Sequence, residues 1–146
     1  MKKVRIVRAD ERHRCNIDHL IHSTHIVDGM SGLVRGFWCA KVGNRIVGCG
    51  GINFINQDTA VLTHIAVEKE FRRQGIGTAL ISRCLDYARD MKVRHIALIT
   101  MYYLFRRFKK HGFRVVRRAT LTEPLSSYPD FTSKRYMKCA VMRRDT

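Results

Sequence analysis

Acidic residues are scarce in this sequence. Its 146 residues include 28 Lys and Arg but only 12 Asp and Glu, which gives a formal net charge of +16. A field of this sign attracts anions such as phosphorylated cofactors, acidic metabolites and nucleic acids, although it can also serve solubility alone. Charge by itself therefore does not choose among these partners.

Long apolar runs and linkers are also missing. No stretch approaches the roughly 20 apolar residues that a membrane-spanning helix needs, and the basic start has no apolar signal core behind it. We therefore expect a cytoplasmic protein with no membrane partner. Only two prolines occur, without a Pro/Gly/Ser linker or a repeat, so we expect one domain over residues 1–146.

Paired cysteines and a complete metal-ligand set are absent as well. The cysteine count is odd and contains no CxxC pair, so reduced and mostly buried thiols are expected at Cys15, Cys39, Cys49, Cys84 and Cys139. Cys15, His19 and His22 share one face of an expected helix, a spacing that can bind zinc or copper. The sequence shows no fourth ligand, and a solvated polar face explains the pattern equally well, so no metal site is predicted.

Hydrophobic periodicity predicts an α/β or α+β fold in one domain, with a mixed central sheet flanked by helices. The expected strands are residues 4–8, 37–41, 45–50, 60–67, 95–99, 115–116 and 135–142. One helix begins after an N-cap at Asp10, one follows Gly77 and runs to about Arg89, and one spans 104–111 and ends at Gly112. Residues 29–36 are expected to form a loop.

Residues 61–80 carry the most informative pattern, a buried strand followed by a basic turn and a helix. The first turn of a helix has unsatisfied N–H groups and the positive end of the helix dipole. Gly75 and Gly77 let a ligand approach the backbone closely, and Arg72 and Arg73 add positive charge. The pattern favours a pyrophosphate site, although an ordinary strand-to-helix turn with exposed arginines has the same composition.

The run Arg72-Arg73-Gln74-Gly75-Ile76-Gly77 resembles the cofactor motif of the GNAT superfamily of N-acetyltransferases. The strand end Ile65-Ala66-Val67 and the later Lys110-His111-Gly112-Phe113 are also similar to that family. The resemblance implies transfer of an acetyl group from acetyl-CoA to an amine that attacks directly in a ternary complex, with no metal. It also implies a cofactor-binding set made up of Ile65, Ala66, Val67, Arg72, Arg73, Gln74, Gly75, Ile76, Gly77 and Thr78.

The usual catalytic pair of that family is missing from its usual positions. Val61 stands where an acid or histidine base is common, and Phe108 stands where a tyrosine is common. His64, Tyr102 and Tyr103 are the candidate substitutes, and Glu68 or Glu70 could act through water. Each has a structural alternative: strict strand alternation puts His64 on the face opposite Val61 unless a bulge intervenes, and the tyrosines can simply pack at the surface.

The acceptor is less well defined. The segments 98–100, 107–113 and 133–137 resemble the acetyltransferase domain of N-acetylglutamate synthases, which favours an amino acid such as glutamate. However, Met101 and Tyr102 stand where a basic residue that binds substrate is expected. Protein amines and aminoacyl-tRNA stay open as acceptors, the latter through a basic patch at 106–118.

Two further properties are left open by the sequence. A protein that kept the fold without catalysis would be an acetyl-CoA sensor or a nucleic-acid-binding module. The intact cofactor motif favours the enzyme over this alternative. The resemblance also implies a homodimer formed through the last strands, because residues 135–142 are apolar enough for such an interface.

Overall fold

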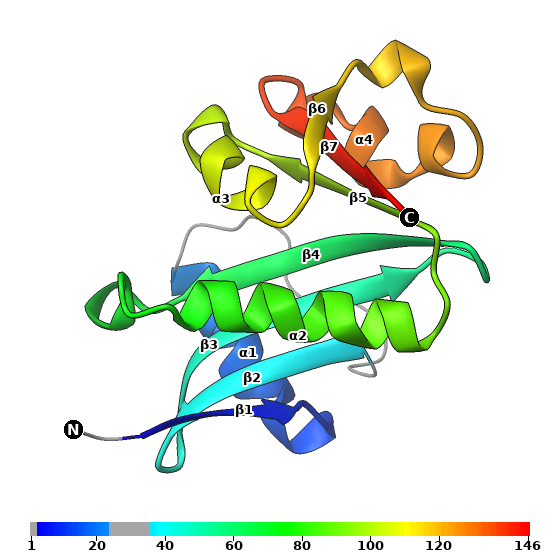
Figure 1. The fold of residues 1–146 in the computed structure, drawn as a ribbon. Helices are drawn as coiled ribbons and strands as arrows, with labels where there is room; N and C mark the ends of the chain where they lie inside the picture. The colour runs from blue at the N-terminus through cyan, green and yellow to red at the C-terminus, as the bar shows by residue number, and fades with distance from the viewer. Residues whose placement is uncertain (1–2, 24–35) are drawn as a thin grey trace. The chain divides into compact units, whose positions relative to one another are not determined.

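A computed structural model describes residues 3–23 and 36–146 (Figure 1). Seven strands form one mixed sheet in the order β1-β2-β3-β4-β5-β7-β6. The strands are β1 (Val4–Arg8), β2 (Phe37–Val42), β3 (Arg45–Phe54), β4 (Thr59–Val67), β5 (His95–Thr100), β6 (Arg114–Val116) and β7 (Ala140–Asp145). The helices are α1 (Arg14–Ser23), α2 (Ile76–Asp90), α3 (Phe105–Lys109) and α4 (Pro129–Thr132). The mixed sheet with flanking helices predicted from the sequence is confirmed. The loop expected at 29–36 lies outside the described residues, except for Gly36.

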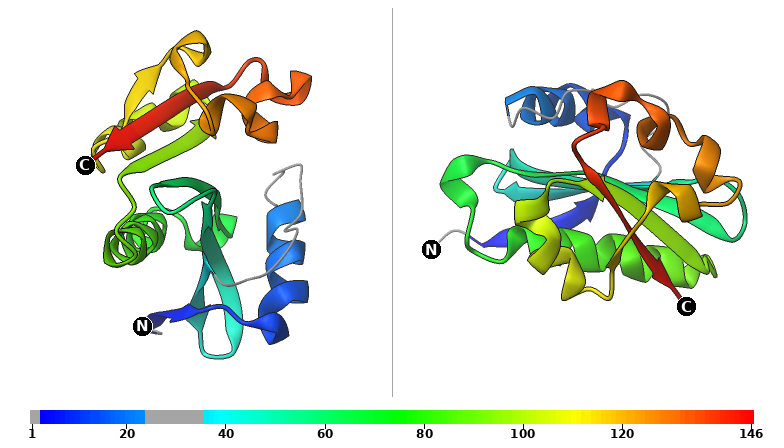
Figure 2. Two further views of the ribbon diagram at one scale, coloured as in Figure 1. Left: turned by 90° about the vertical axis from the view of Figure 1, so that its right-hand side faces the viewer. Right: turned by 90° about the horizontal axis from the view of Figure 1, so that it is seen from above.

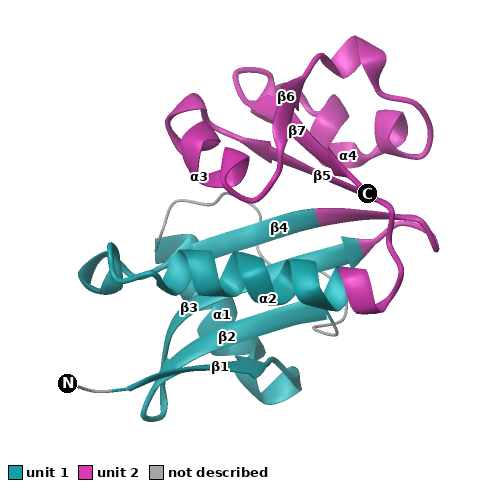
Figure 3. Cartoon of the chain, viewed as in Figure 1, with its two compact units in different colours: residues 1–53, 62–88 teal, residues 54–61, 89–146 magenta. Residues whose placement is uncertain are grey.

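The chain divides into two compact units (Figure 3). Unit 1 comprises residues 1–53 and 62–88, and unit 2 comprises residues 54–61 and 89–146. Strand β4 contributes residues to both units, because the division falls between Val61 and Leu62.

Unit 1 is built on the antiparallel strands β1, β2 and β3, with a helix on each face of this part of the sheet (Figure 2). Ile17, Leu20 and Ile21 of α1 share a buried cluster with Cys39, whereas Leu80 of α2 lies in a second cluster with Ala40 and Val47. Successive strand residues point to opposite faces, so the neighbours Cys39 and Ala40 direct α1 and α2 to different faces.

Close contact between α2 and β3 depends on a small residue. A Cβ added at Gly48 would lie 3.1 Å from Leu80 Cδ1 and 3.2 Å from Ile76 Cγ2, both on α2. Gly48 therefore lets the first turns of α2 lie directly on the sheet. The β2–β3 hairpin turns at Gly43. Its φ of +60° lies in the left-handed region, which glycine adopts without steric cost.

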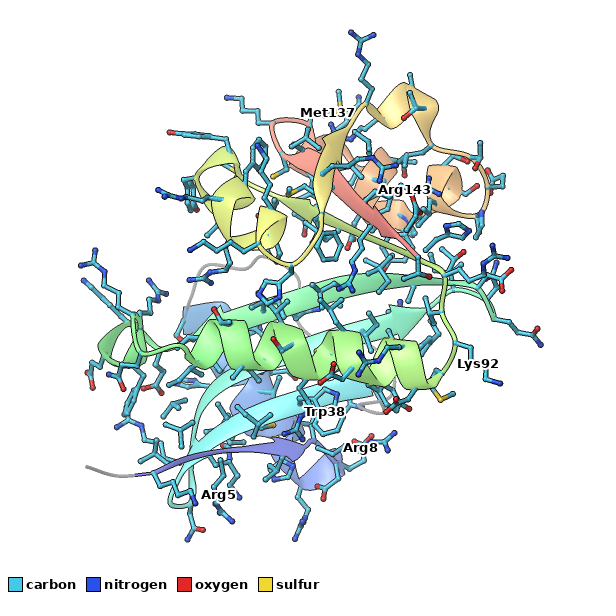
Figure 4. All side chains as sticks on the ribbon, viewed as in Figure 1. Arg5, Arg8, Trp38, Lys92, Met137 and Arg143 are labelled. Carbon is cyan, nitrogen blue, oxygen red and sulfur yellow. The ribbon has the colours of Figure 1, made fainter. Side chains whose placement is uncertain are left out.

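Unit 2 contains the central strand β7, which pairs antiparallel with both β5 and β6. Thr59–Val61 of β4 pairs parallel with His95–Ala97 of β5. The carboxylate of Asp145, at the end of β7, ties these strands together: it accepts hydrogen bonds from His95 of β5 at 2.7 Å, from Arg114 of β6 at 3.1 Å and from Arg143 at 2.9 Å. Arg143 is labelled in Figure 4.

Two expectations about the last third of the chain were wrong. The strand expected at 135–142 begins only at Ala140 and continues to Asp145, while Lys134–Tyr136 forms a 3-10 turn. Because β5 and β6 pair with β7 on its two sides, the charged end of β7 is also part of the sheet. Helix α4 was not predicted, although Pro129 at its first turn is a typical start signal.

The cysteines are free, as expected, but they are not all buried. Cys39, Cys49 and Cys84 are buried, Cys139 is half-buried and Cys15 is exposed. Burial raises the pKa of Cys39 and of Cys84 to about 12, so these thiols stay protonated and packed. No helix in the described part of the chain is long and apolar enough to cross a membrane.

Candidate functional site: the turn before α2 and the residues around β4

The turn between β4 and α2 starts with an arginine that folds back onto the strand. Arg72 Nε donates a hydrogen bond of 2.9 Å to the carbonyl oxygen of Val67. The backbone N–H of Glu68 donates to the carbonyl of Val47 at 2.8 Å, and Arg45 Nη2 contacts the Glu68 carboxylate at 2.6 Å. Arg72 and Glu68 therefore hold the start of the turn. No local sequence pattern predicted the contact of Arg45 with Glu68, because the two residues lie 23 positions apart in the chain.

The backbone of the turn adopts the left-handed conformation twice. Arg73 has φ +65° and Gly75 has φ +81°, and the left-handed region costs a non-glycine residue about 1–2 kcal/mol. A Cβ added at Gly75 would meet nothing within 4 Å. The glycine is therefore required by its conformation and not by packing against the protein.

Gly75 also begins the helix, since its carbonyl accepts the N–H of Ala79 at 3.0 Å. The N–H groups of Ile76, Gly77 and Thr78 then belong to the first turn, where no intrahelical acceptor exists. Ile76 and Gly77 are buried, while Arg73, Gln74, Gly75 and Thr78 are exposed. Buried Ile76 anchors the first turn, and the exposed residues surround the free amides.

This turn combines several features that favour an anion. The 15 residues of α2 direct the positive end of the helix dipole at the turn, and Arg72 and Arg73 are exposed beside it. Free amides, positive dipole and positive side chains all favour an anion. The strained conformation of Arg73 is typical of a backbone shaped for a ligand. The structure brings together every residue of the predicted 72–78 loop.

The other part of the predicted cofactor set lies at the end of β4. Ala66 and Val67 are buried and Ile65 is half-buried. Parallel pairing of β4 with β5 runs from Thr59 to Val61, and Ile65 lies four residues further along the strand. Val67 is joined to the turn at 72–78 through the hydrogen bond from Arg72, so the strand end and the turn form one connected segment of unit 1.

His64 departs from regular strand geometry. Its φ of +55° is left-handed, which interrupts the alternation of β4 and removes the argument that strict alternation fixes its face. The imidazole Nδ1 lies 2.9 Å from Thr63 Oγ1, and the ring centroid lies 5.7 Å from that of Phe37. The side chain is half-buried.

The two positions where the family resemblance placed a base and an acid hold core side chains. Val61 is only 1% exposed and belongs to a buried cluster with Ala97 and Val141. Phe108 is 6% exposed, and its ring contacts that of Phe113 edge-on with centroids 6.1 Å apart. Neither position can transfer a proton.

Tyr102 and Tyr103 lie in a 3-10 turn directly after β5. They are 76% and 67% exposed, and their rings contact each other edge-on at 5.7 Å. Their hydroxyl groups are thus accessible, but the rings do not pack into the core.

The helix face with Cys15, His19 and His22 is exposed, opposite the buried Ile17 and Leu20. Within the residues that the structure describes, no group of three or more His, Cys, Asp or Glu side chains is placed to hold a metal ion.

Comparison with known proteins identifies the family to which this chain is similar. The family model described as Acetyltransferase (GNAT) family matches residues 8–113. A curated relative from Mycobacterium tuberculosis, named amino-acid acetyltransferase, is 29% identical over 92 residues, which are 61% of this chain and 52% of the relative. The chain therefore spans about half the length of that relative.

Solved structures show the same fold. A Mycobacterium tuberculosis protein in complex with CoA and a second ligand matches with a TM-score of 0.81 at 21% identity, over 97% of this chain and 99% of that one. N-acetylglutamate synthase from Neisseria gonorrhoeae, in complex with CoA and N-acetyl-glutamate, matches with a TM-score of 0.83 at 18% identity, over 99% of this chain and 35% of that one.

Proposed function

Because this chain belongs to the acetyltransferase (GNAT) family, whose model covers residues 8–113, we propose that it transfers an acetyl group from acetyl-CoA to the amine of a free amino acid, with glutamate as the first candidate. The family match agrees with the enzyme class predicted from the sequence. The observation that carries the proposal is the turn at 72–78, where left-handed Arg73 and Gly75 open the first turn of α2 toward an anion.

Donor binding follows from the chemistry of that turn. The N–H groups from Arg73 to Thr78 would hold the pyrophosphate of acetyl-CoA, and the side chain of Arg73 would balance part of its charge. Backbone groups of Ile65 and Val67 would hold the pantetheine arm, which presents amides that can pair with a strand. Acetyl-CoA supplies the thioester carbonyl that the acceptor attacks.

The residues of the chain then have two tasks, which are to orient the amine and to remove its proton. An amino group attacks only when it is neutral, so a base that accepts its proton raises the rate. His64 is the first candidate for this base, because it is half-buried next to the predicted pantetheine segment and its ring is positioned by Thr63. The exposed hydroxyl of Tyr102 or Tyr103 is the candidate donor of a proton to the departing thiolate.

The acceptor is inferred from charge and from the relatives. An acidic amino acid is attracted by a chain of net charge +16. One relative is named amino-acid acetyltransferase, and one structural neighbour was solved with N-acetyl-glutamate. A polycationic acceptor would be repelled by the same field.

The proposal is tested by incubating the protein with acetyl-CoA and a panel of glutamate, other amino acids, peptides and aminoacyl-tRNA, with products read by mass spectrometry. Gly75→Ala is the informative variant, because it places a methyl group in the turn at φ +81°. Gly43→Ala is its matched control. Gly43 also has positive φ and open space around it, so both variants carry a similar backbone strain, but Gly43 lies in the β2–β3 hairpin.

We expect acetyl-glutamate as product, and we expect Gly75→Ala to raise the KM for acetyl-CoA about tenfold or more while Gly43→Ala leaves it unchanged. Acetylation of another acceptor would overturn the glutamate assignment only. Binding of acetyl-CoA without any product would favour a sensor. Equal KM values for the two glycine variants would refute the assignment of the turn.

A further inference from the structure

The charge of unit 2 is concentrated in one acid-free stretch. Residues 91–122 contain no Asp or Glu. Within it, four basic side chains follow one another at the surface on and just after α3: Arg106, Arg107, Lys109 and Lys110. Together with Tyr102 and Tyr103, which precede them, we call these residues the basic surface.

Helix geometry orients this surface. Arg106, Lys109 and Lys110 are spaced i, i+3 and i+4, so they share one face of α3, while Phe108 points the opposite way into the core. The 3-10 turn with the two tyrosines runs directly into α3, since the Phe105 N–H donates to the Tyr102 carbonyl. Cations and aromatic rings are therefore held on one short rigid segment.

The cations of the basic surface form no ion pair within the part of the chain that the structure describes. Arg114 and Arg143 pair with Asp145 and Arg45 pairs with Glu68, whereas no ion pair joins any of the four basic side chains to a residue in 3–23 or 36–146. The excess of positive charge also affects the adjacent His111. Its pKa is lowered by burial and by the positive charges of Arg144 and Arg107. An anion bound here would meet cations that are not neutralised.

The tyrosines are a second and independent sign of a ligand. Large aromatic side chains normally bury much of their surface, yet these two rings expose 76% and 67%. Their edge-on contact at 5.7 Å fixes the two ring planes relative to each other. Each ring thus leaves a face on which a planar group can stack.

Phosphate-binding cations next to exposed aromatic rings match the chemistry of an unpaired nucleic-acid strand, where phosphates and bases alternate. Helix α3 has five residues, about 7.5 Å, which is too short to read a duplex groove. Unpaired bases that can stack on side chains are typical of loops and ends of folded RNA. We propose that the basic surface binds single-stranded RNA, with phosphates on Arg106, Arg107, Lys109 and Lys110 and bases on Tyr102 and Tyr103.

Solubility alone does not account for this pattern. A surface that serves solubility intersperses both signs of charge, and it gains nothing from two exposed tyrosines. The acid-free stretch instead produces a local field of one sign. The proposal goes beyond acetyl transfer, and it can be tested separately because RNA binding is measured without any acceptor or product.

The test measures binding of the full chain to a fluorescent 12-nucleotide single-stranded RNA by anisotropy, over a series of salt concentrations. The first variant is Arg106→Gln/Lys109→Gln/Lys110→Gln. Its control is Lys3→Gln/Arg5→Gln/Lys41→Gln, which removes the same residue types and the same charge from unit 1, at the residue before β1, in β1 and in β2. A second pair compares Tyr102→Ala/Tyr103→Ala with Tyr102→Phe/Tyr103→Phe, and thermal melting checks the folding of each.

We expect the α3 variant to bind RNA at least about tenfold more weakly and to reduce the salt slope by about 2, from three lost phosphate contacts. The control variant should keep that slope. The double alanine variant should lose about tenfold, while the double phenylalanine variant keeps stacking and affinity.

Three results would overturn the proposal. Equal losses in the two charge variants would show a diffuse field without a docking surface. Equal competition by polyglutamate, with no effect of the alanine pair, would indicate an acidic protein partner. Loss of RNA binding in saturating acetyl-CoA would assign the basic surface to the donor site.

Discussion

His64 is held by contacts on its backbone and on its ring. Its carbonyl accepts a hydrogen bond from the Cys49 thiol at 3.3 Å. Its Nδ1 lies 2.9 Å from Thr63 Oγ1, and its backbone is left-handed. Asparagine tolerates that conformation, so His64→Asn removes the ring base while the backbone strain stays low. We predict a fall of about 100-fold in kcat with little change in the KM for acetyl-CoA.

Chemical rescue separates a base from a packing residue at this position. With His64 as the base, added imidazole restores part of the activity of His64→Asn, because a free base then accepts the proton of the amine. A packing residue would show no rescue and would lower only the thermal stability. Steady-state rates with and without imidazole distinguish the two, and the second pattern would direct the search for a base to Tyr102 and Tyr103.

Phe108 occupies the position where the family resemblance suggests a tyrosine. Because its side chain is buried, a tyrosine at this position would affect the stability of the fold. A hydroxyl group added here would enter the contact with Phe113 in a side chain that is 6% exposed. An unpaired buried hydroxyl costs about 1–3 kcal/mol. We predict that Phe108→Tyr lowers the free energy of unfolding by this amount without raising kcat. The control is Phe105→Tyr, at a half-buried position of the same helix, and greater activity of Phe108→Tyr would contradict the prediction.

At the scale of single residues, the sequence identified positions better than conformations. The motif at 72–77 predicted which residues form the turn before α2, because a tight turn into a helix needs glycine for conformational reasons. It did not predict that Arg72 binds Val67, or that Arg73 and His64 are left-handed. These features depend on neighbours brought together by the sheet and leave no local pattern.

The end of α3 shows how one glycine shapes an element. Gly112 has φ +89°, its N–H donates to the Lys109 carbonyl at 3.0 Å, and the Phe113 N–H donates to the Phe108 carbonyl at 3.2 Å. These two hydrogen bonds and the contact between Phe108 and Phe113 form a Schellman motif. The Gly-Phe pair noted in the sequence therefore ends the helix and returns the chain to β6.

We predict that Gly112→Ala lowers the free energy of unfolding by about 1 kcal/mol, because alanine is strained at positive φ. Sterics contribute little, since the nearest atom to an added Cβ is Arg144 Cδ at 3.5 Å. Urea unfolding of the wild type and the variant gives the difference, and Gly112→Asn should lose less because asparagine tolerates this region. Equal losses for alanine and asparagine would argue against backbone strain as the cause.

Elements with a local signal were predicted well, and those defined by pairing were not. Apolar stripes placed α1 and α2, and Gly43-Asn44 placed the β2–β3 hairpin. Strand β7 was misplaced because its charged end, Arg143 to Asp145, looks like surface sequence. Only its neighbours β5 and β6 make this segment a central strand, and the acid–base contacts of Asp145 are visible only once these strands pair.

Across the described residues, several acidic side chains pair with basic ones. Asp10 pairs with Arg12, Glu11 with Arg14, and Glu68 with Arg45. Exposed pairs of this kind contribute little to stability. Asp145 differs, because its carboxylate contacts basic side chains from three strands, namely His95 of β5, Arg114 of β6 and Arg143 of β7.

The stability of the protein in acid should therefore depend on Asp145. Burial raises the pKa of this carboxyl, but hydrogen bonds from His95, Arg143 and Arg114 outweigh it and lower the pKa to about 2, from an ordinary value of 3.8. A carboxyl with a lowered pKa stabilises the fold above its unfolded pKa, and the contribution is lost as the pH falls from about 4 to about 2. Asp145→Asn removes this contribution at every pH.

We predict that Asp145→Asn is less stable than the wild type by roughly 1–2 kcal/mol at pH 5, after allowance for solvent screening. The difference should shrink toward zero near pH 2, because the wild-type carboxyl is then protonated too. Urea unfolding at several pH values between 2 and 5 measures it, with Asp90→Asn at the exposed end of α2 as the control. A difference that stays constant across this window would mean that Asp145 acts through packing, and that the ion pairs joining β5, β6 and β7 do not stabilise the sheet.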